Sequence, residues 1–543
     1  MISLLVLLPL IGAAIALIAE ILRLRTLDAV ATVASLFTAT AVALRVTVSA
    51  VTAGVAVAVG GWIPPVGIEL RLDGLTSIGV LVVFIIALLI YWYARAEGSY
   101  GPHFSFVFLT AVAGMIGLML STDLFNMFVF FEILSLSAYL LIAYKRKPRA
   151  VYAGFRYLVI GTVGMSLYLL GVFVLYRETG VLSIHAIADA GAGEAPSPEM
   201  LIATAAIIAG IGTRVAFFPF HIWLPEAHGE APHPVSALLS GLMIKAGFLT
   251  LFRIVNAVPA VPITMLFEIL GPVTAVAGVM LALVQTDMKR LLAFHSVSQM
   301  GYILTGFAAL GSVGAGVAVA GSLFHMVNHA LFKSLLFLTI GIVISQTGKR
   351  RITDLAGLGL RMPLVAACFV VGAASISGVP LFNGYVSKTM LSAGTKEFAL
   401  YPLLTITSIG TVASFIKLST VFRGRSRTAP GIERVARRMY PPIVTIAAGC
   451  VAIGLFPGQT AALFSRLTNI STIQTIDFFG GQAMVDTAIV LAVGFMLYRV
   501  VTHPVLSRLV AAARRARLGI EPSVVAVLYG FAGVAMVFML MAR

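Results

Sequence analysis

Ionisable side chains lie in the middle of long apolar runs of this sequence. Glu132 is about eight residues into the run that starts at Leu124, and Lys245 is about ten residues into a later run. A charged side chain at the centre of a bilayer costs at least about 3 kcal/mol, so each one needs a reason to be there. A carboxylate and a buried lysine can each bind and release a proton, which favours a proton pathway through both residues. A static charge pair that only fixes helix packing is the alternative.

A third charge, Arg214, lies five residues before Pro219 and is equally deep in its run. The arginine guanidinium keeps its proton under protein conditions. We therefore expect Arg214 to hold or bias the carboxylate of Glu132, while Lys245 titrates.

A later run carries titratable residues on one helix face. His325, Asn328, His329 and Lys333 are spaced by three and four residues, which places them on the same face of a helix. Because histidine titrates near neutral pH, this face predicts a relay that leads to Lys333. No acidic ligand accompanies the histidine pair, and no nucleotide, flavin or cluster motif occurs, so neither a metal nor a cofactor is expected.

Lys388 follows a proline-interrupted segment, where a water-filled cavity would suit its ammonium group; an interfacial lysine is the alternative. His221, His295 and Lys417 are further candidates for the pathway. Lys417 is about five residues from a basic end and could instead reach the membrane surface by snorkelling. One polar cluster between two runs is either a solvated loop or a place of proton uptake, and its members are His221, Glu226, His228, Glu230 and His233.

The composition indicates which kind of secondary structure must position these residues. The chain has 543 residues, of which 60% are hydrophobic and 11% charged, and its mean hydropathy is +1.03. Apolar runs of membrane-spanning length recur about sixteen times. We therefore predict an all-α polytopic membrane protein, embedded in the lipid bilayer, with about 14–16 transmembrane helices.

The net charge of +16 does not indicate nucleic-acid binding, because the lysines and arginines lie between the apolar runs. Basic clusters such as Lys145–Arg149, Lys349–Arg351, Arg423–Arg438 and Arg508–Arg517 fall on alternate loops. This is the positive-inside pattern, and it predicts that both termini lie outside and that the chain sits in the cell membrane.

Two helices are predicted to be broken at prolines, one around Phe218–Pro225 and one around Gly378–Gly384. Each break falls in the fourth helix of a five-helix stretch, and such matched interruptions indicate two inverted repeats around a transport site. The predicted organisation is N-terminal helices over 1–103, a first repeat over 104–256, a second repeat over 264–422 and C-terminal helices over 439–543.

These motifs together resemble the antiporter-like subunits shared by Mrp-type multisubunit cation/proton antiporters, respiratory complex I and group 4 membrane-bound hydrogenases such as formate hydrogenlyase. The resemblance covers nearly the whole chain. It is carried by Asp123–Asn126 with Glu132, Phe218–Pro225, Pro234–Leu238 with Lys245, Asp287–Ala293, and His325–Lys333.

The resemblance implies roles for single residues. Glu132 matches the glutamate of the family's fifth helix, Lys245 the lysine of the eighth and Lys388 the lysine of the twelfth, and the eleventh helix supplies His325, His329 and Lys333. The seventh helix usually holds a lysine where this chain has Arg214. This departure bears on whether the first half relays protons from lysine to lysine.

Three classes of function remain open from the sequence. The length and the Trp62–Asp73 segment favour a membrane component of an Mrp-type antiporter, similar to the D-type subunit of those assemblies, that moves protons and exchanges them for sodium or potassium alongside other membrane subunits. The alternative is the proton-pumping module of a complex I-like or hydrogenase complex, in which redox chemistry elsewhere drives the protons. A transporter that works as a single chain is disfavoured, because the resembled family works in complexes.

Overall fold

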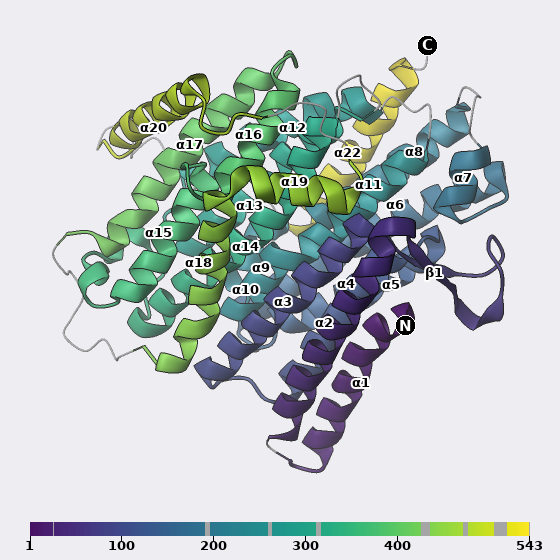
Figure 1. Cartoon of the computed structure of the whole chain (residues 1–543), viewed down its shortest axis with the longest axis horizontal. Coiled ribbons are helices and arrows are strands. Elements are labelled where there is room, and N and C mark those ends of the chain that lie inside the picture. The colour runs from purple at the N-terminus through teal and green to yellow at the C-terminus, as the bar shows by residue number, and fades with distance from the viewer. Residues whose placement is uncertain are drawn as a thin grey trace.

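Most of the chain forms helices that run side by side in a tilted bundle (Figure 1). The computed structural model describes residues 1–24, 26–190, 196–258, 263–310, 316–424, 435–470, 476–503 and 519–541. Within these residues, 14 helices are long and apolar enough to cross a membrane. The prediction of an all-α polytopic membrane protein is confirmed.

The N-terminal part consists of three helices and a small hairpin that projects from the edge of the bundle (Figure 1). The strands pair antiparallel, with Val55 opposite Leu72 and Ala58 opposite Glu69. The apolar tip of the hairpin is exposed, including Trp62 at 69%. The elements are α1 (Ile2–Ile21), α2 (Leu27–Ala53), β1 (Val55–Ala58), the 3₁₀ turn Val59–Gly61, β2 (Glu69–Leu72) and α3 (Gly74–Glu97).

The next stretch corresponds to the first predicted repeat. Asp123 begins α5 as its N-cap, because its carboxylate accepts a hydrogen bond from the backbone N–H of Asn126 at 2.7 Å. The elements are α4 (Pro102–Leu120), α5 (Leu124–Ile142), α6 (Pro148–Thr179), α7 (Ile184–Ala190), α8 (Pro198–Val215), α9 (Leu224–Glu230), α10 (His233–Leu238), the π turn Leu239–Met243 and α11 (Ile244–Ala257).

The second predicted repeat follows, and Asp287 caps its second helix, α13, by the same chemistry. α13 is helical but too polar to count among the apolar spans. The elements are α12 (Ile263–Leu283), α13 (Met288–Phe307), α14 (Gly316–Thr347), the 3₁₀ turns Ile352–Asp354 and Leu358–Leu360, α15 (Pro363–Ser377), α16 (Asn383–Thr395), α17 (Tyr401–Ser419) and the 3₁₀ turn Thr420–Phe422.

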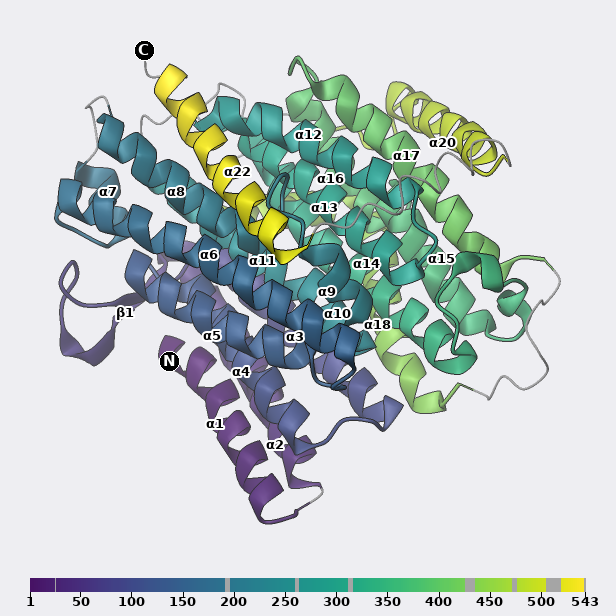
Figure 2. The same cartoon turned by 180° about the vertical axis from the view of Figure 1, so that it is seen from behind.

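The C-terminal helices lie on the outside of the bundle. α22 crosses the face formed by α6 and α8, and α20 packs on α17 at the opposite edge (Figure 2). The elements are the 3₁₀ turn Arg437–Met439, α18 (Tyr440–Leu455), α19 (Pro457–Thr468), α20 (Gly481–Val501) and α22 (Ile520–Met541). The starting end of α1 and the final end of α22 point to the same side of the bundle (Figure 1), as the loop charges predict.

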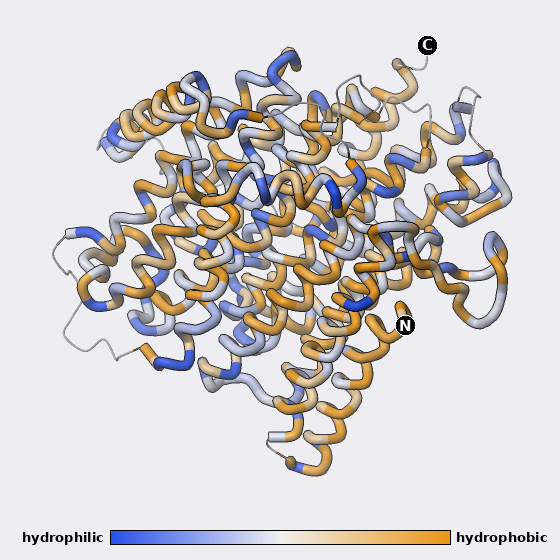
Figure 3. Tube along the Cα trace, in the orientation of Figure 1, coloured by the Kyte–Doolittle hydropathy of each residue, from blue (hydrophilic) through white to orange (hydrophobic). Residues whose placement is uncertain are grey.

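Apolar residues dominate the helices, while hydrophilic residues gather mainly at the helix ends and loops (Figure 3). The 32-residue helix α14 lies in the interior, and its central histidines and lysine are almost completely buried. Lipid offers no hydrogen bonds, so these interior polar groups must find partners inside the protein.

Both predicted helix breaks are present. α8 ends at Val215 and the chain becomes helical again at Leu224, while α15 ends at Ser377 and α16 starts at Asn383. Each first half ends in a left-handed residue, Ala216 at φ 57° and Gly378 at φ 76°. The inversion of the two repeats and their limits remain predictions. The basic cluster Arg508–Arg517 and most of the Arg423–Arg438 stretch lie outside the described residues, as does the link at Gly311.

Candidate functional site

The first break brings Arg214 against Glu132. An Arg214 guanidinium nitrogen lies 3.2 Å from a carboxylate oxygen of Glu132, and the guanidinium also stacks 5.7 Å above the ring of Tyr157. Gly161 makes room, because a Cβ added there would lie 2.2 Å from Arg214 Nη1. Arg214 therefore forms an ion pair with Glu132, and its part in biasing that carboxylate remains a prediction.

The carboxylate of Glu132 differs in one respect from the sequence-based expectation of a charge enclosed by the core. Its depth along α5 is as predicted, but its side chain is 31% exposed, whereas that of Arg214 is 6% exposed. Depth along a helix follows from counting residues, but the direction that a face points follows only from packing. Glu132 thus lies at the periphery, where another chain or lipid can approach it.

Lys245 sits directly after the π turn in the span formed by α10 and α11. Its ammonium group donates to the backbone carbonyl of Ser240, which belongs to that turn. A π turn leaves carbonyl groups with weaker helical partners, and such turns are frequent at functional sites. The turn therefore supplies Lys245 with an acceptor inside an apolar span.

Lys333 receives the matching acceptor from α13. Its Nζ donates to the Leu292 carbonyl at 2.5 Å, and the residue is fully buried. Lys245 and Lys333 interact electrostatically with each other, and His329 interacts with both. Both ring nitrogens of His329 are buried without a hydrogen-bond partner among the described residues. The predicted histidine-and-lysine face thus points at Lys245.

Both ring nitrogens of His325, one turn before His329, form hydrogen bonds, and one of them reaches the helix that follows the second break. Its ring nitrogens hydrogen-bond with Ser387 Oγ at 2.9 Å and Gln299 Oε1 at 3.0 Å. Asn328 and Asn383 exchange hydrogen bonds across the break through their amides and backbone carbonyls. These bonds fasten α14 to the first turn of α16, where the second half of the interrupted helix begins.

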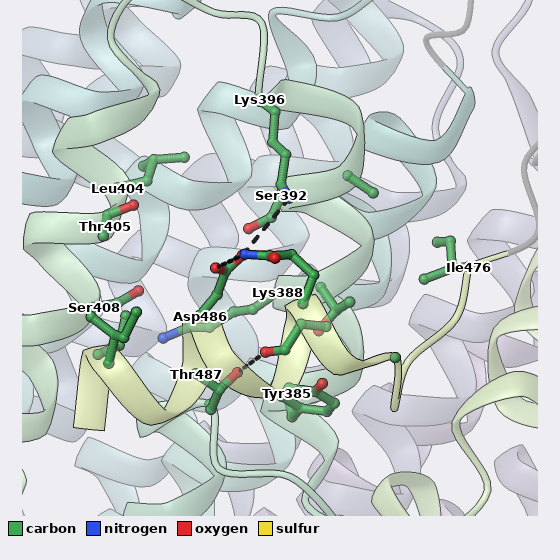
Figure 4. Close-up of a pocket in the computed structure, with 18 of the residues that line it drawn as sticks. Tyr385, Lys388, Ser392, Lys396, Leu404, Thr405, Ser408, Ile476, Asp486 and Thr487 are labelled. Carbon is green, nitrogen blue, oxygen red and sulfur yellow. Dashed lines mark hydrogen bonds and ion pairs between the residues drawn. The ribbon is translucent and has the colours of Figure 1, made fainter. Parts of the chain in front are cut away.

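Lys388 is the last of the buried charged residues described above, which together we call the line. It lies in a cavity of about 820 Å³ between α16, α17 and α20. Its Nζ donates to the Ile376 carbonyl at 2.8 Å, at the end of α15, and lies 4.9 Å from the ring centroid of Tyr302. Figure 4 shows Lys388 in this cavity, with Lys396 and Asp486 beyond it. The predicted cavity beside Lys388 is therefore present.

The three weaker candidates have separate positions. His295 contacts the ring of Phe415 at 4.9 Å and lies within electrostatic range of Lys333. His221 stacks on Phe218 inside the first break. Lys417 donates to the carbonyls of Leu283 and Gln285 at the end of α12. Their part in the pathway remains a prediction.

The polar cluster after the first break forms a clamp between the two halves. Glu230 pairs with Arg350 at 3.0 Å and with Arg290 at 3.5 Å, and Arg350 also pairs with Asp287 at 3.0 Å. Burial alone would raise the pKa of Glu230, but the two arginines hold it below the ordinary value. These ion pairs fasten α9 to the start of α13 and to the segment that follows α14.

His228, in the same cluster, lies inward rather than in a loop. It is fully buried, neither ring nitrogen has a hydrogen-bond partner among the described residues, and it interacts electrostatically with Lys289, Lys333 and Lys245. The interpretation of the cluster as a solvated loop therefore fails at this residue, because a seven-residue helix, α9, turns it into the core.

Sequence reasoning missed several neutral polar residues on the line. Ser240, Ser296, Gln299 and Tyr302 all contact it and are buried. The only signal for them is their place in apolar runs, which is weak because small polar residues such as serine also occur at ordinary helix contacts in membranes. Among the described residues, no three histidine, cysteine or acidic side chains gather in a way that could hold a metal ion.

Residues 121–415, which include every charged member of this line except Lys417, match the family model described as NADH:quinone oxidoreductase/Mrp antiporter, TM. The chain belongs to this family. It is an antiporter-like, proton-translocating, multi-pass membrane subunit of the kind found in multisubunit membrane complexes.

Similar proteins come from several kinds of complex. NADH-quinone oxidoreductase subunit N of Desulforudis audaxviator (strain MP104C) is 37% identical over 74% of this chain and 84% of its own length. Hydrogenase-4 component B of Escherichia coli (strain K12) is 30% identical over 75% of this chain and 65% of its own length. A chain of the Mrp complex from Dietzia sp. DQ12-45-1b superposes with a TM-score of 0.79 at 25% identity, over 90% of this chain and 99% of that one.

Proposed function

We propose that this chain conducts protons along the line from Glu132 through Lys245, His329 and Lys333 to Lys388. The observation that carries the proposal is the continuity of this line. From Lys245 onward the members interact electrostatically with one another: Lys245 with Lys333, His329 with both lysines, and His325 with Lys245 and Lys388. Lys388, the last member, lies beside the cavity of about 820 Å³, while Glu132 joins the line only through its ion pair with Arg214.

The lysines suit proton transfer because of what surrounds them. Among the described residues neither Lys245 nor Lys333 forms an ion pair, and each donates to a backbone carbonyl. Two ammonium groups close to each other without a carboxylate repel, so gain of a proton by one favours its loss by the other. His329, which lies within range of both, is placed to pass the proton between them.

Arg214 has a different part in this scheme. It cannot give up its proton, so it holds a fixed positive charge next to the carboxylate of Glu132. Since Glu132 is partly exposed, a proton can reach it from a neighbouring subunit rather than from the interior of this chain. This supports work inside a complex with other membrane subunits.

We infer that the complex is a multisubunit cation/proton antiporter of the Mrp type in the cell membrane, in which this chain takes the place of the D-type subunit and protons exchange for sodium or potassium. The superposition that covers 99% of a chain of the Dietzia Mrp complex supports this assignment. The exposed hairpin tip around Trp62 lies in the segment that favours the same branch.

A redox-driven complex is the second candidate. The 37% identity to an NADH-quinone oxidoreductase subunit N supports it. The same proton line would then be driven by electron transfer in partner subunits.

Two measurements test these proposals. Acidification of inverted membrane vesicles that contain the whole complex should collapse in Lys245→Ala and Lys333→Ala, and full acidification in both variants would refute the proton line. Purification of the complex through a tag on this chain separates the assemblies. Small membrane partners alone, with exchange that depends on sodium or potassium, support the antiporter, whereas subunits with iron–sulfur absorbance support the redox complex.

A further inference from the structure

The two predicted repeats meet at a pair of serines. Ser240, in the π turn of the last helical span of the first repeat, has its hydroxyl oxygen 2.7 Å from that of Ser296, in α13 of the second repeat. Both residues are fully buried. A hydroxyl can donate and accept at once, so this contact is a hydrogen bond whichever oxygen donates.

Each serine is joined to one of the central lysines through a backbone carbonyl. The Ser240 carbonyl accepts from Lys245. The Ser296 hydroxyl lies 3.3 Å from the Leu292 carbonyl, which also accepts from Lys333 at 2.5 Å. Hydrogen bonds thus lead from Lys333 through the Leu292 carbonyl and the Ser296 hydroxyl to the Ser240 hydroxyl, and the covalent bonds of Ser240 connect that hydroxyl to the carbonyl that holds Lys245.

The packing at this point is close. A Cβ added at Gly241 would lie 2.2 Å from the hydroxyl oxygen of Ser334, the neighbour of Lys333 on α14. The π turn thus presses against α14 while Ser240 reaches α13. A small shift of the turn would move the acceptor of Lys245 relative to that of Lys333.

We propose that the Ser240–Ser296 hydroxyl pair is a positioning element that locks the two repeats in the register in which Lys245 and Lys333 exchange a proton. The serines do not contact either ammonium group with their hydroxyls, so they act through the carbonyls that hold the lysines. The inference rests on the proposed proton line and names the residues that join its two halves.

The titratable groups around the two lysines come from several helices, and their charges affect any test by pH. Four histidines interact electrostatically with one or both lysines: His228 from α9, His295 from α13, and His325 and His329 from α14. These histidines in turn interact with Lys289 on α13, Lys388 on α16 and Lys417 on α17.

The test uses the whole complex in inverted vesicles and compares Ser240→Ala, Ser296→Ala and the double variant. Loss of a buried hydrogen bond is worth about 1 kcal/mol, so each single variant should lower the proton transport rate roughly fivefold. The double variant should fall no further than either single one, since both remove the same bond. The alkaline limb of the pH profile should move to lower pH, because misplaced carbonyls stabilise the protonated lysines less.

Ser298→Ala is the matched control. Ser298 is on the same helix, fully buried, and its hydroxyl has no hydrogen-bond partner among the described residues. It should leave both the rate and the pH profile unchanged. Ser296→Thr retains a hydroxyl and should restore most of the rate.

An unchanged pH profile in both alanine variants, or an additive loss in the double variant, would overturn the positioning role. That result is distinct from failure of the proton line, which shows as full transport in Lys245→Ala and Lys333→Ala. Comparable amounts of assembled complex, measured by pull-down, separate the effect from loss of folding.

Discussion

The two broken helices share the same kind of backbone interruption, but the free space beside the two interruptions differs greatly. The first break ends beside Arg214 in a space of about 10 Å³, room for about one water molecule, whereas the second opens beside Lys388 into a cavity of about 820 Å³. Both place a cation near the last turn of a helix, where the helix dipole favours positive charge.

The difference comes from the C-terminal helices that cover each break. α22 presses on the first break so closely that a Cβ added at Gly530 would lie 2.7 Å from Phe220. Its Ser523 also accepts a hydrogen bond from Arg156, which pairs with Glu226 at 2.6 Å. α20, by contrast, contacts mainly α17 and leaves the cavity beneath it. The same interruption of a helix thus leaves almost no free space beside Arg214 in one half and a large cavity beside Lys388 in the other.

The largest expected effect lies at the open break. In Lys388→Met the cavity should lose the group that takes up and releases protons, and transport should fall roughly 100-fold, the usual value of a proton-transfer group. Lys396→Met is the matched control, because Lys396 follows the same helix but is 55% exposed and forms a long ion pair with Asp486 at 3.9 Å. Vesicle acidification measures both, and equal rates in the two variants would contradict the comparison.

At the first break, which is closed because it has little free space beside Arg214, the effect of a substitution on proton transport should be smaller and should depend on charge. Glu132→Gln leaves the guanidinium of Arg214 without its carboxylate, so transport should fall roughly tenfold, equivalent to about 1.4 kcal/mol. Arg214→Lys keeps the charge but loses the planar contact with Tyr157, and a roughly threefold loss is expected. Full transport in both variants, measured in the same vesicles, would show that this pair is only structural.

The tight packing of the closed break can be tested through stability. Gly161→Ala places a methyl group where Arg214 lies, and should lower the free energy of unfolding by about 1–3 kcal/mol. Gly533→Ala, on α22, has nothing within 4 Å of the added Cβ and serves as the control. Thermal unfolding of the detergent-purified protein gives both values, and similar unfolding temperatures would argue against the close approach of Arg214.

The smallest expected effect concerns the clamp that joins the halves at Glu230. Its pKa in the folded protein lies below the ordinary 4.5, so its ion pairs stabilise the fold above that pH and the contribution is lost as the pH falls through the folded-state pKa. Glu230→Gln should therefore be less stable than the parent protein at neutral pH, and the gap should close on acidification. A gap that is independent of pH in thermal unfolding would mean that the charge is not what matters.

The sequence by itself determined the all-α polytopic architecture, both break positions and the depth of each charge along its helix. Hydrophobic length, proline chemistry and residue spacing are local properties, so Lys245, His329 and Lys333 could be assigned to the interior from their runs alone. The family resemblance also follows from motifs that are contiguous in the chain.

Only the tertiary structure decided which faces meet. It turned Glu132 outward, brought His228 inward, and paired Ser240 with Ser296 across 56 positions of sequence. It also decided that α22 closes one break while α20 leaves the other open. These outcomes depend on which helices pack together, and the apolar surfaces of membrane helices are too alike for residue types alone to specify that choice.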